Sequence, residues 1–179
     1  MSTALCFEGH AIVSADGMIA AADGSMPAAL RSDADWRSFQ AALDRSALVV
    51  LGRKGHERHP NPGRRRLVLT GSVATLAADP VDRLATLWNP AGIEFEQVLE
   101  RLKITEGVIA ITGGRATFDL FLPHYSSFVL SEVAGLLLPA GVPCFSAGAP
   151  ADVLAASGLA AAPATEIDPG VTQTVWARG

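Results

Sequence analysis

The sequence predicts an α/β fold with a largely parallel central sheet covered by helices on both faces. Short apolar runs alternate with segments whose apolar residues recur at helical spacing. The runs lack the polar/apolar alternation of a sheet with one wet face, so we expect strands buried on both sides. Three runs end at Gly52, Gly71 and Gly113. These glycines should meet at the edge of the sheet where such folds bind ligands.

Composition is consistent with one soluble domain over residues 1–179. Hydrophobic residues make up 49% and charged residues 18% of the chain, enough for a core and little for a disordered tail. The net charge of −4 argues against nucleic-acid binding. We find no secretion signal and no apolar run long enough to cross a bilayer. We therefore expect a cytoplasmic monomer or homodimer with no membrane partner, in which Cys6 and Cys144 are buried free thiols.

The elements are expected in a regular order. A strand near 11–13 leads into an Asp-Gly turn at 16–17 and a loop over 21–26. Helical spacing predicts helices over 33–42, with Ser32 as N-cap, over 95–102, and around 118–122 before Pro123. Apolar runs predict strands at 47–51, 67–70, 84–87 and 108–112, and β character returns at 127–133, 142–145 and 171–177.

Two strand ends have the composition of an anion-binding site. Gly52 is followed by Arg53 and Lys54, and the paired Gly113-Gly114 separates a buried strand from a helix. Glycine lets backbone N–H groups approach a phosphate, and the cations would add charge. The alternatives are solvated cations at the first position and an ordinary tight turn at the second.

Two further charged positions have both a structural and a functional interpretation. Asp33, at the start of a helix, could simply favour the helix dipole or could act in a site. The arginines at 64–66 could form a solvated hairpin edge or hold a carboxylate or phosphate. The four histidines show no metal-ligand spacing, and P-loop and G-x-S-x-G motifs are absent from the sequence.

Taken in order, these segments resemble the dihydrofolate reductase-like superfamily over roughly residues 11–145, with a fainter match in the last strand. The segments that support this resemblance are 24–27, Asp33 with Trp36, 51–54, 62–64, 69–72, 82–84, 113–114 and 118–123. The resemblance implies a three-layer fold with an antiparallel C-terminal edge. It also implies hydride transfer from NADPH to a C=N bond of dihydrofolate or a related pterin.

The resemblance assigns Asp33 as the catalytic carboxylate and Ser131 as the hydroxyl that hydrogen-bonds it. The implied substrate contacts are Ala11, Ile12, Met26, Arg37, Arg64 and Phe118, with Arg64 on the carboxylate of the folate tail. The implied cofactor contacts are Ile19, Gly52, Arg53, Lys54, Thr70, Ser72, Thr112, Gly113, Gly114, Arg115, Ala116 and Thr117. Among these, Arg53, Lys54 and Ser72 would hold the 2′-phosphate, and Gly113-Gly114 would form a cis pair. Residues 21–27 resemble a loop that closes over nicotinamide.

The sequence also departs from this pattern. Ala28 and Ala29 replace a usual Trp-Asn pair, Arg37 replaces an apolar ring, and Gly55 and Ala116 replace a threonine and an arginine near the cofactor. The segment 14–20 resembles the riboflavin-pathway reductases of the same superfamily, whose ribosylated pyrimidine phosphate could be held by Arg37 or the arginines at 64–66. Two alternatives to pterin reduction therefore stay open: pyrimidine reduction, and a non-catalytic nucleotide-binding module of the same fold.

Overall fold

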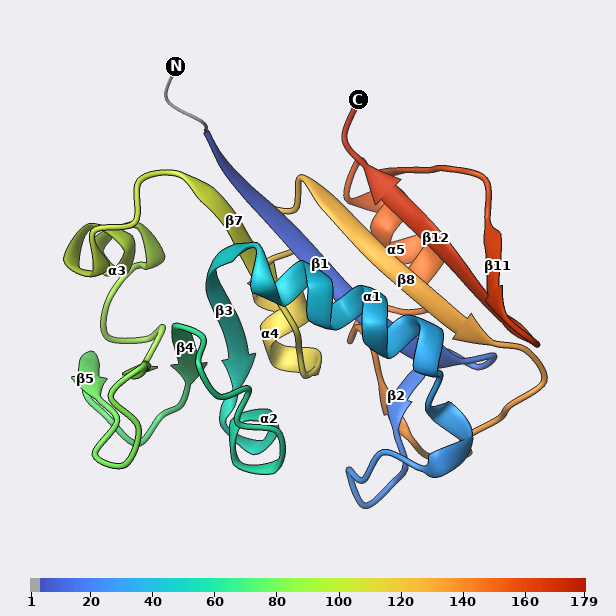
Figure 1. Ribbon diagram of the computed structural model, residues 1–179, viewed down its shortest axis with the longest axis horizontal. Helices are drawn as coiled ribbons and strands as arrows, with labels where there is room; N and C mark the ends of the chain where they lie inside the picture. The colour runs from blue at the N-terminus through green and yellow to red at the C-terminus, as the bar shows by residue number, and fades with distance from the viewer. Residues whose placement is uncertain (1–3) are drawn as a thin grey trace.

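The computed structural model describes residues 4–179 and confirms an α/β fold built around one large mixed sheet. The strands follow the spatial order β10-β12-β8-β1-β7-β3-β4-β6-β5, with β11 also paired to β12 (Figure 1). Their bounds are β1 Leu5–Ser14, β3 Ser46–Gly52, β4 Arg66–Leu69, β5 Leu76–Ala78, β6 Ala85–Trp88, β7 Gly107–Ile111, β8 Ser127–Val133, β10 Ala160–Ala161, β11 Thr165–Asp168 and β12 Val171–Ala177. A separate small ribbon pairs β2 (Met18–Ala20) with β9 (Val142–Pro143).

The six strands from β8 to β6 in this order run parallel, and both ends of the sheet are antiparallel. At one end β12 pairs antiparallel with β8, and at the other β5 pairs antiparallel with β6. The predicted antiparallel C-terminal edge is therefore confirmed. Strand β1 lies between β7 and β8, in the register Gly9 opposite Ile111 and Ile12 opposite Ser131.

Helices cover both faces of the sheet, with α1 in front of it in Figure 1 and α4 and α5 behind it. Their bounds are α1 Asp33–Asp44, α2 Arg53–Arg58, α3 Phe95–Leu102, α4 Arg115–Leu120 and α5 Pro150–Ala156, with a 3₁₀ turn η1 at Ala28–Leu30. Consecutive residues of β3 divide between the two layers: Val49 and Leu51 pack with Leu43 of α1, whereas Leu48 and Val50 join the larger core cluster.

Helix α1 begins where the sequence predicts. The Ser32 hydroxyl accepts a hydrogen bond from the Asp35 backbone N–H at 3.2 Å and donates one to Asp168 Oδ2 at 2.9 Å. The first contact satisfies an otherwise unpaired N–H of the first turn. The second ties the start of α1 to β11, on the antiparallel edge of the sheet.

Three features differ from the sequence expectations. Helix α2 was not predicted because none of its residues is buried, so it has no apolar stripe. Helix α5 was not predicted because alanines dominate it and leave little apolar periodicity, although Pro150 marks its start. Both cysteines are free thiols, but Cys6 is exposed rather than buried. No helix of residues 4–179 is long and apolar enough to cross a membrane.

Candidate active site

The glycines at the ends of β3 and β7 come together at the carboxyl edge of the sheet. The Gly52 N–H donates to the Gly113 carbonyl at 2.8 Å, and the Gly113–Gly114 peptide bond is cis, as the resemblance implied. A Cβ atom on Gly52 would lie 3.5 Å from Thr117 Oγ1 and 3.7 Å from Gly114 N. A Cβ atom on Gly114 would lie 3.8 Å from Ile19 Cδ1. Five predicted cofactor contacts therefore form one close cluster.

A half-buried carboxylate lies under α1, but it is Asp35 and not Asp33. Ser131 Oγ donates to Asp35 Oδ1 at 2.6 Å, and Gln173 Nε2 donates to Ser131 Oγ at 3.1 Å. Asp33 is exposed in the first turn of the helix. The predicted pairing of Asp33 with Ser131 is wrong, because two residues along an α-helix rotate a side chain by about 200°.

Burial determines the proton affinity of Asp35. Removal from water raises the pKa of this carboxyl above its ordinary value, and the Ser131 hydrogen bond and the nearby His10 oppose that rise. Ser131 itself is completely buried. The site thus holds a carboxyl group that keeps its proton to higher pH than an exposed aspartate would.

The strand register places this carboxylate and the glycine cluster on either side of β1. Ile12 pairs with Ser131 on β8, while Gly9 pairs with Ile111, two residues before Gly113. Ala11 and Ile12, both predicted substrate contacts, therefore lie between the two groups. Adjacent strands are about 4.8 Å apart, so β8 and β7 are separated by roughly 10 Å.

An open cavity of about 400 Å³ extends from α1 to the loop after α2. It is lined by Trp36, Gln40, Arg58, His59, Pro60, Asn61, Pro62 and Arg64. Trp36, the residue after Asp35, has 52% of its surface exposed and offers a flat apolar wall. Arg37 is exposed and does not line this cavity, because it projects from a different side of α1.

Both arginines of this cavity already have partners. Arg64 lines the cavity as predicted, and its Nε and Nη2 atoms donate to Asp44 Oδ1 at 3.1 and 2.6 Å. Arg58 donates to the carbonyl of Gly24, in the loop between β2 and η1. A carboxylate that approached Arg64 would therefore compete with Asp44, and Arg58 links the cavity wall to the loop at residues 21–27.

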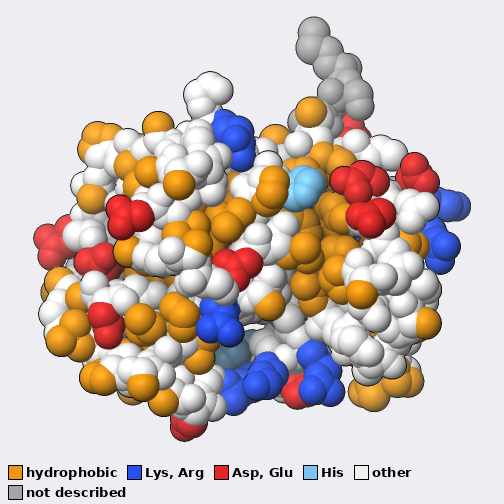
Figure 2. All heavy atoms as spheres, turned by 180° about the vertical axis from the view of Figure 1, so that it is seen from behind, with side chains coloured by type: hydrophobic (Ala, Val, Ile, Leu, Met, Phe, Trp, Pro, Cys, Tyr) orange, Lys and Arg blue, Asp and Glu red, His pale blue; other side chains and the backbone are white. Residues whose placement is uncertain are grey.

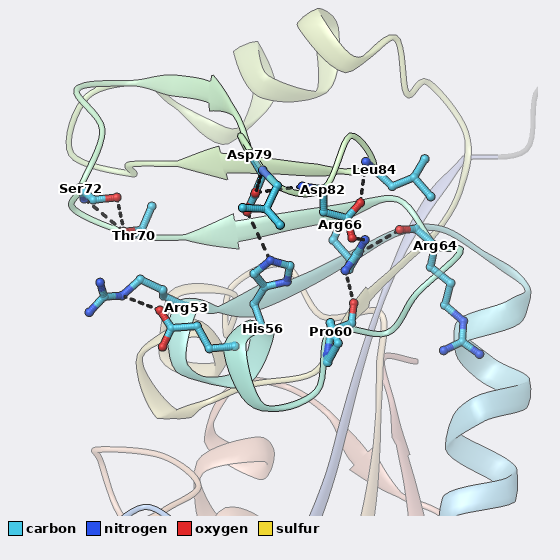
Figure 3. Close-up of polar contacts among 12 residues, drawn as sticks. Arg53, His56, Pro60, Arg64, Arg66, Thr70, Ser72, Asp79, Asp82 and Leu84 are labelled. Atoms are coloured by element: carbon cyan, nitrogen blue, oxygen red, sulfur yellow. Dashed lines mark hydrogen bonds and ion pairs between the residues drawn. The ribbon is translucent and has the colours of Figure 1, made fainter.

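The cations and hydroxyls predicted to hold a 2′-phosphate follow adjacent parallel strands. Arg53 and Lys54 follow β3 and are exposed; Thr70 and Ser72 follow β4, where their hydroxyls are hydrogen-bonded at 2.9 Å (Figure 3). Arg53 Nε lies 3.7 Å from Glu57 Oε1, one turn along α2. Figure 2 shows Lys and Arg side chains gathered at the lower edge of the molecule, where α2 lies, beside a hollow in the surface.

The platform behind these cations is held by a contact between His56 and Asp79 and by an ion pair between Arg66 and Asp82 (Figure 3). His56 Nε2 of α2 lies 3.4 Å from Asp79 Oδ2, after β5. The completely buried Arg66 side chain donates to Asp82, to the Pro60 carbonyl and, at 3.0 Å, to the Arg64 carbonyl. These contacts fix α2 and the loop at 60–64 relative to β4 and β6.

The remaining predicted site residues differ in position. Phe118 is 2% exposed and packs edge-on against Phe128 with ring centroids 5.5 Å apart. The assignment of Phe118 as a substrate contact is corrected, because its ring is buried in the core. The ring supports the glycine turn from below, since a Cβ on Gly113 would lie 2.8 Å from it. Met26 and Thr112 are half-buried, and Arg115 and Ala116 are exposed on the first turn of α4.

Sequence reasoning missed Asp35 as the site carboxylate, together with His10, Asp44 and Arg58. The signal for Asp35 was available: it lies four residues before Phe39 and eight before Leu43, on the apolar side of the helix. Asp44 and Arg58 contact residues that are 20 and 34 positions away, so no local pattern marked them. The contact of His10 with Glu8 depends on both side chains lying on the same face of a strand.

Comparison with solved structures shows that the chain has the dihydrofolate reductase-like fold. A putative riboflavin biosynthesis protein from Shewanella sp. PV-4 superposes with a TM-score of 0.71 at 19% identity, covering 97% of this chain and 99% of the other. Dihydrofolate reductase from Enterococcus faecalis, complexed with NADP(H) and RAB-propyl, gives 0.70 at 19% identity and covers 100% and 99%.

A third structure extends the same likeness. A diaminohydroxyphosphoribosylaminopyrimidine deaminase/5-amino-6-(5-phosphoribosylamino)uracil reductase from Thermotoga maritima gives a TM-score of 0.68 at 14% identity, covering 99% of this chain and 57% of the other. Neither a protein-family model nor a curated protein matches the sequence. At these identities the likeness defines the fold class and leaves the chemistry to the residues of this chain.

Proposed function

We propose that this protein is an NADPH-dependent reductase that transfers hydride to a C=N bond of a flat heterocycle, with dihydrofolate or a related pterin as the first substrate to test. The observation that supports this most directly is the Asp35–Ser131 pair. It places a half-buried carboxyl across β1 from a glycine cluster suited to a dinucleotide. A reduction of this kind needs both a hydride and a proton. The glycine cluster would hold the cofactor that supplies the hydride, and the carboxyl would supply the proton.

The residues around the glycine cluster fit the proposed cofactor. Gly52 and Gly114 bring backbone close together without a side chain between them, so a pyrophosphate could approach the main chain. Arg53, Lys54 and the Thr70–Ser72 hydroxyls offer charge and hydrogen bonds to a 2′-phosphate. When bound, NADPH supplies the hydride, and the protein contributes orientation and a proton source.

Asp35 fits the role of general acid. Because burial raises its pKa, the carboxyl retains a proton for delivery at a pH where an exposed aspartate would be ionised. Ser131 fixes one oxygen of the carboxyl through a 2.6 Å hydrogen bond, which leaves the other oxygen to face the heterocycle. Trp36 would flank the substrate where it leaves the carboxyl and enters the open cavity.

A second candidate substrate is a ribosylated pyrimidine phosphate. The cavity presents Arg58 and His59 beside Trp36, a combination that suits a phosphate attached to a planar ring. The Arg64–Asp44 pair favours the same alternative, because it lowers the affinity expected for the carboxylate tail of folate.

The test is to follow oxidation of NADPH with dihydrofolate, an unconjugated dihydropterin and a ribosylated aminopyrimidine phosphate in parallel. Turnover with either pterin supports pterin reduction, and turnover with the pyrimidine alone supports the second candidate. Tight NADPH binding without turnover of any of the three would leave a nucleotide-binding module and contradict the proposal.

Substituting Asp35 tests the proton source. Asp35→Asn keeps the size and can still accept from Ser131, but it has no acidic proton, so kcat should fall by about 10²–10⁴-fold. Asp33→Asn is the matched comparison, two residues away on the exposed side of α1, and should cost little activity. Equal losses in the two variants, or a larger loss in Asp33→Asn, would restore the assignment made from the sequence.

A further inference from the structure

A second polar layer lies under α1, one step along β1 from the proposed active site. His10 is buried, with 8% of its surface exposed. Its Nε2 atom lies 2.8 Å from Glu8 Oε1, and Arg45, at the end of α1, donates to the same oxygen at 2.5 Å. Glu8 thus links the buried His10 ring to Arg45, whose side chain reaches the surface.

The strand geometry directs this layer toward Asp35. His10 and Ile12 are two residues apart on β1, so their side chains project from the same face of the sheet. Ile12 lies opposite Ser131, whose hydroxyl holds Asp35. The His10 ring contacts Phe39, with ring centroids 5.7 Å apart, and Phe39 lies one helical turn after Asp35. His10 is therefore about one turn of α1 from the site carboxyl.

We infer that His10 is a positioning residue: protonated and held in place by Glu8, it lies about one helical turn from the Asp35 carboxyl and favours transfer of the Asp35 proton to the bound heterocycle. This inference rests on the proposed function. His10 acts through Asp35 and does not touch the substrate.

The charges around Asp35 support this role. Burial alone would make the carboxyl a weak acid, because its ionised form would have lost most of its hydration. A positive charge on His10 would stabilise that ionised form through a region with little water. Among the other charged groups on this side, Glu8 pairs with both His10 and Arg45, and Asp168 accepts a hydrogen bond from Ser32.

The contact with Glu8 keeps the His10 ring in place. The hydrogen bond from His10 is the main cause of a lowered pKa for the Glu8 carboxyl, so Glu8 stays ionised and continues to hold the histidine. In each reaction cycle one hydride and one proton go to the C=N bond. Asp35 is left ionised beside a charged His10 until it takes up a proton from solvent.

The experiment measures the titration of Asp35 directly. The protein is labelled with ¹³C at aspartate side chains, and the Asp35 carboxyl is followed by NMR against pH in the wild type, His10→Gln and His10→Asn. Both substitutions are neutral, and glutamine can still hydrogen-bond Glu8. We expect Asp35 to titrate at higher pH in both variants. His124→Gln, at an exposed histidine remote from Asp35 in sequence and packed against Phe7 and Phe121, should leave the Asp35 curve unchanged.

Kinetics provide the second measurement. In His10→Gln the fall of kcat at alkaline pH should move to higher pH, and kcat on the acidic plateau should drop about 3- to 10-fold because Asp35 is then a weaker acid. KM should stay unchanged. A folded His10→Gln or His10→Asn protein with the wild-type Asp35 titration would overturn the inference. If the Asp35 titration moves as expected but the wild type reduces none of the substrates, the coupling stands and the proposed function fails.

Discussion

Arg66 places a guanidinium group in the interior at the start of β4, with none of its side chain exposed. Asp82 supplies the opposite charge, and the carbonyls of Arg64 and Pro60 accept hydrogen bonds from the Nε and Nη1 atoms of Arg66. A buried cation is tolerated only when its charge and its donors are matched in this way. The same contacts hold the loop at 60–64, which forms one wall of the cavity.

Replacing Arg66 should therefore destabilise the protein strongly. Arg66→Met fills much of the volume but removes the donors to the Pro60 and Arg64 carbonyls and the charge that Asp82 faces, so the free energy of unfolding should fall by about 3 kcal/mol. Urea denaturation followed by circular dichroism measures this change. Arg65→Met is the control, because Arg65 is exposed and makes one contact, to the Leu102 carbonyl. A loss of less than about 1 kcal/mol in Arg66→Met would show that the network contributes little.

Helix α2 is the element on which the proposed recognition of NADPH depends. It is six residues long, has no buried residue, and is fixed by the His56–Asp79 contact and by its packing on β3 and β4. Its exposed first turn presents Arg53 and Lys54 to the carboxyl edge of the sheet. Glu57 lies close enough to Arg53 to compete with a bound phosphate for the same guanidinium.

The cofactor prediction follows from this arrangement. The double substitution Arg53→Ala with Lys54→Ala should weaken NADPH by about 100-fold and NADH by much less, because only NADPH carries the 2′-phosphate. Glu57→Gln should tighten NADPH two- to threefold, roughly the effect of removing one exposed competing charge. Fluorescence titration with each cofactor measures both effects. Equal weakening of NADPH and NADH by the double substitution would refute the assignment.

At the scale of the whole molecule, several carboxylates are held by ion pairs or by hydrogen bonds to nearby residues. Asp82 pairs with Arg66, Asp79 accepts from the Val81 N–H, Asp16 accepts from Ser14, and Glu8 pairs with His10. In each of the four cases this contact is the main reason why the pKa of the carboxyl lies below its ordinary value. The carboxylates thus favour the folded protein in their ionised form.

The fold should accordingly lose stability in acid. A carboxyl whose pKa is lower in the folded state contributes stability above its unfolded pKa, near 4, and this contribution disappears as the pH falls further. Asp35 has the opposite sign: its raised pKa stabilises the folded state below the unfolded pKa, and that contribution is lost as pH rises. Because five carboxyl groups with a lowered pKa, these four and Asp23, oppose one with a raised pKa, we expect the free energy of unfolding to fall between pH 5 and about pH 3.

Urea unfolding at a series of pH values measures this slope, and Asp82→Asn should make it shallower. A flat profile from pH 5 to pH 3 would contradict the expectation.

Asp35→Asn should have the reverse effect at neutral pH: it removes a poorly hydrated charge, so the variant should be more stable than the wild type at pH 7. Higher stability together with lower activity would indicate that Asp35 is maintained for function at a cost to the fold.

The sequence by itself determined the alternation of strands and helices, the start of α1 at Ser32, and the glycines at the ends of β3 and β7. These follow from local chemistry: apolar runs, a capping hydroxyl, and residues without a side chain. The tertiary structure alone decided that Asp35 and not Asp33 is hydrogen-bonded to Ser131, that Phe118 lies in the core, and that Arg64 is paired with Asp44. The physical reason is that helix rotation and strand register combine residues about 20 to 100 positions apart, and no local pattern records which of two neighbouring carboxylates faces inward.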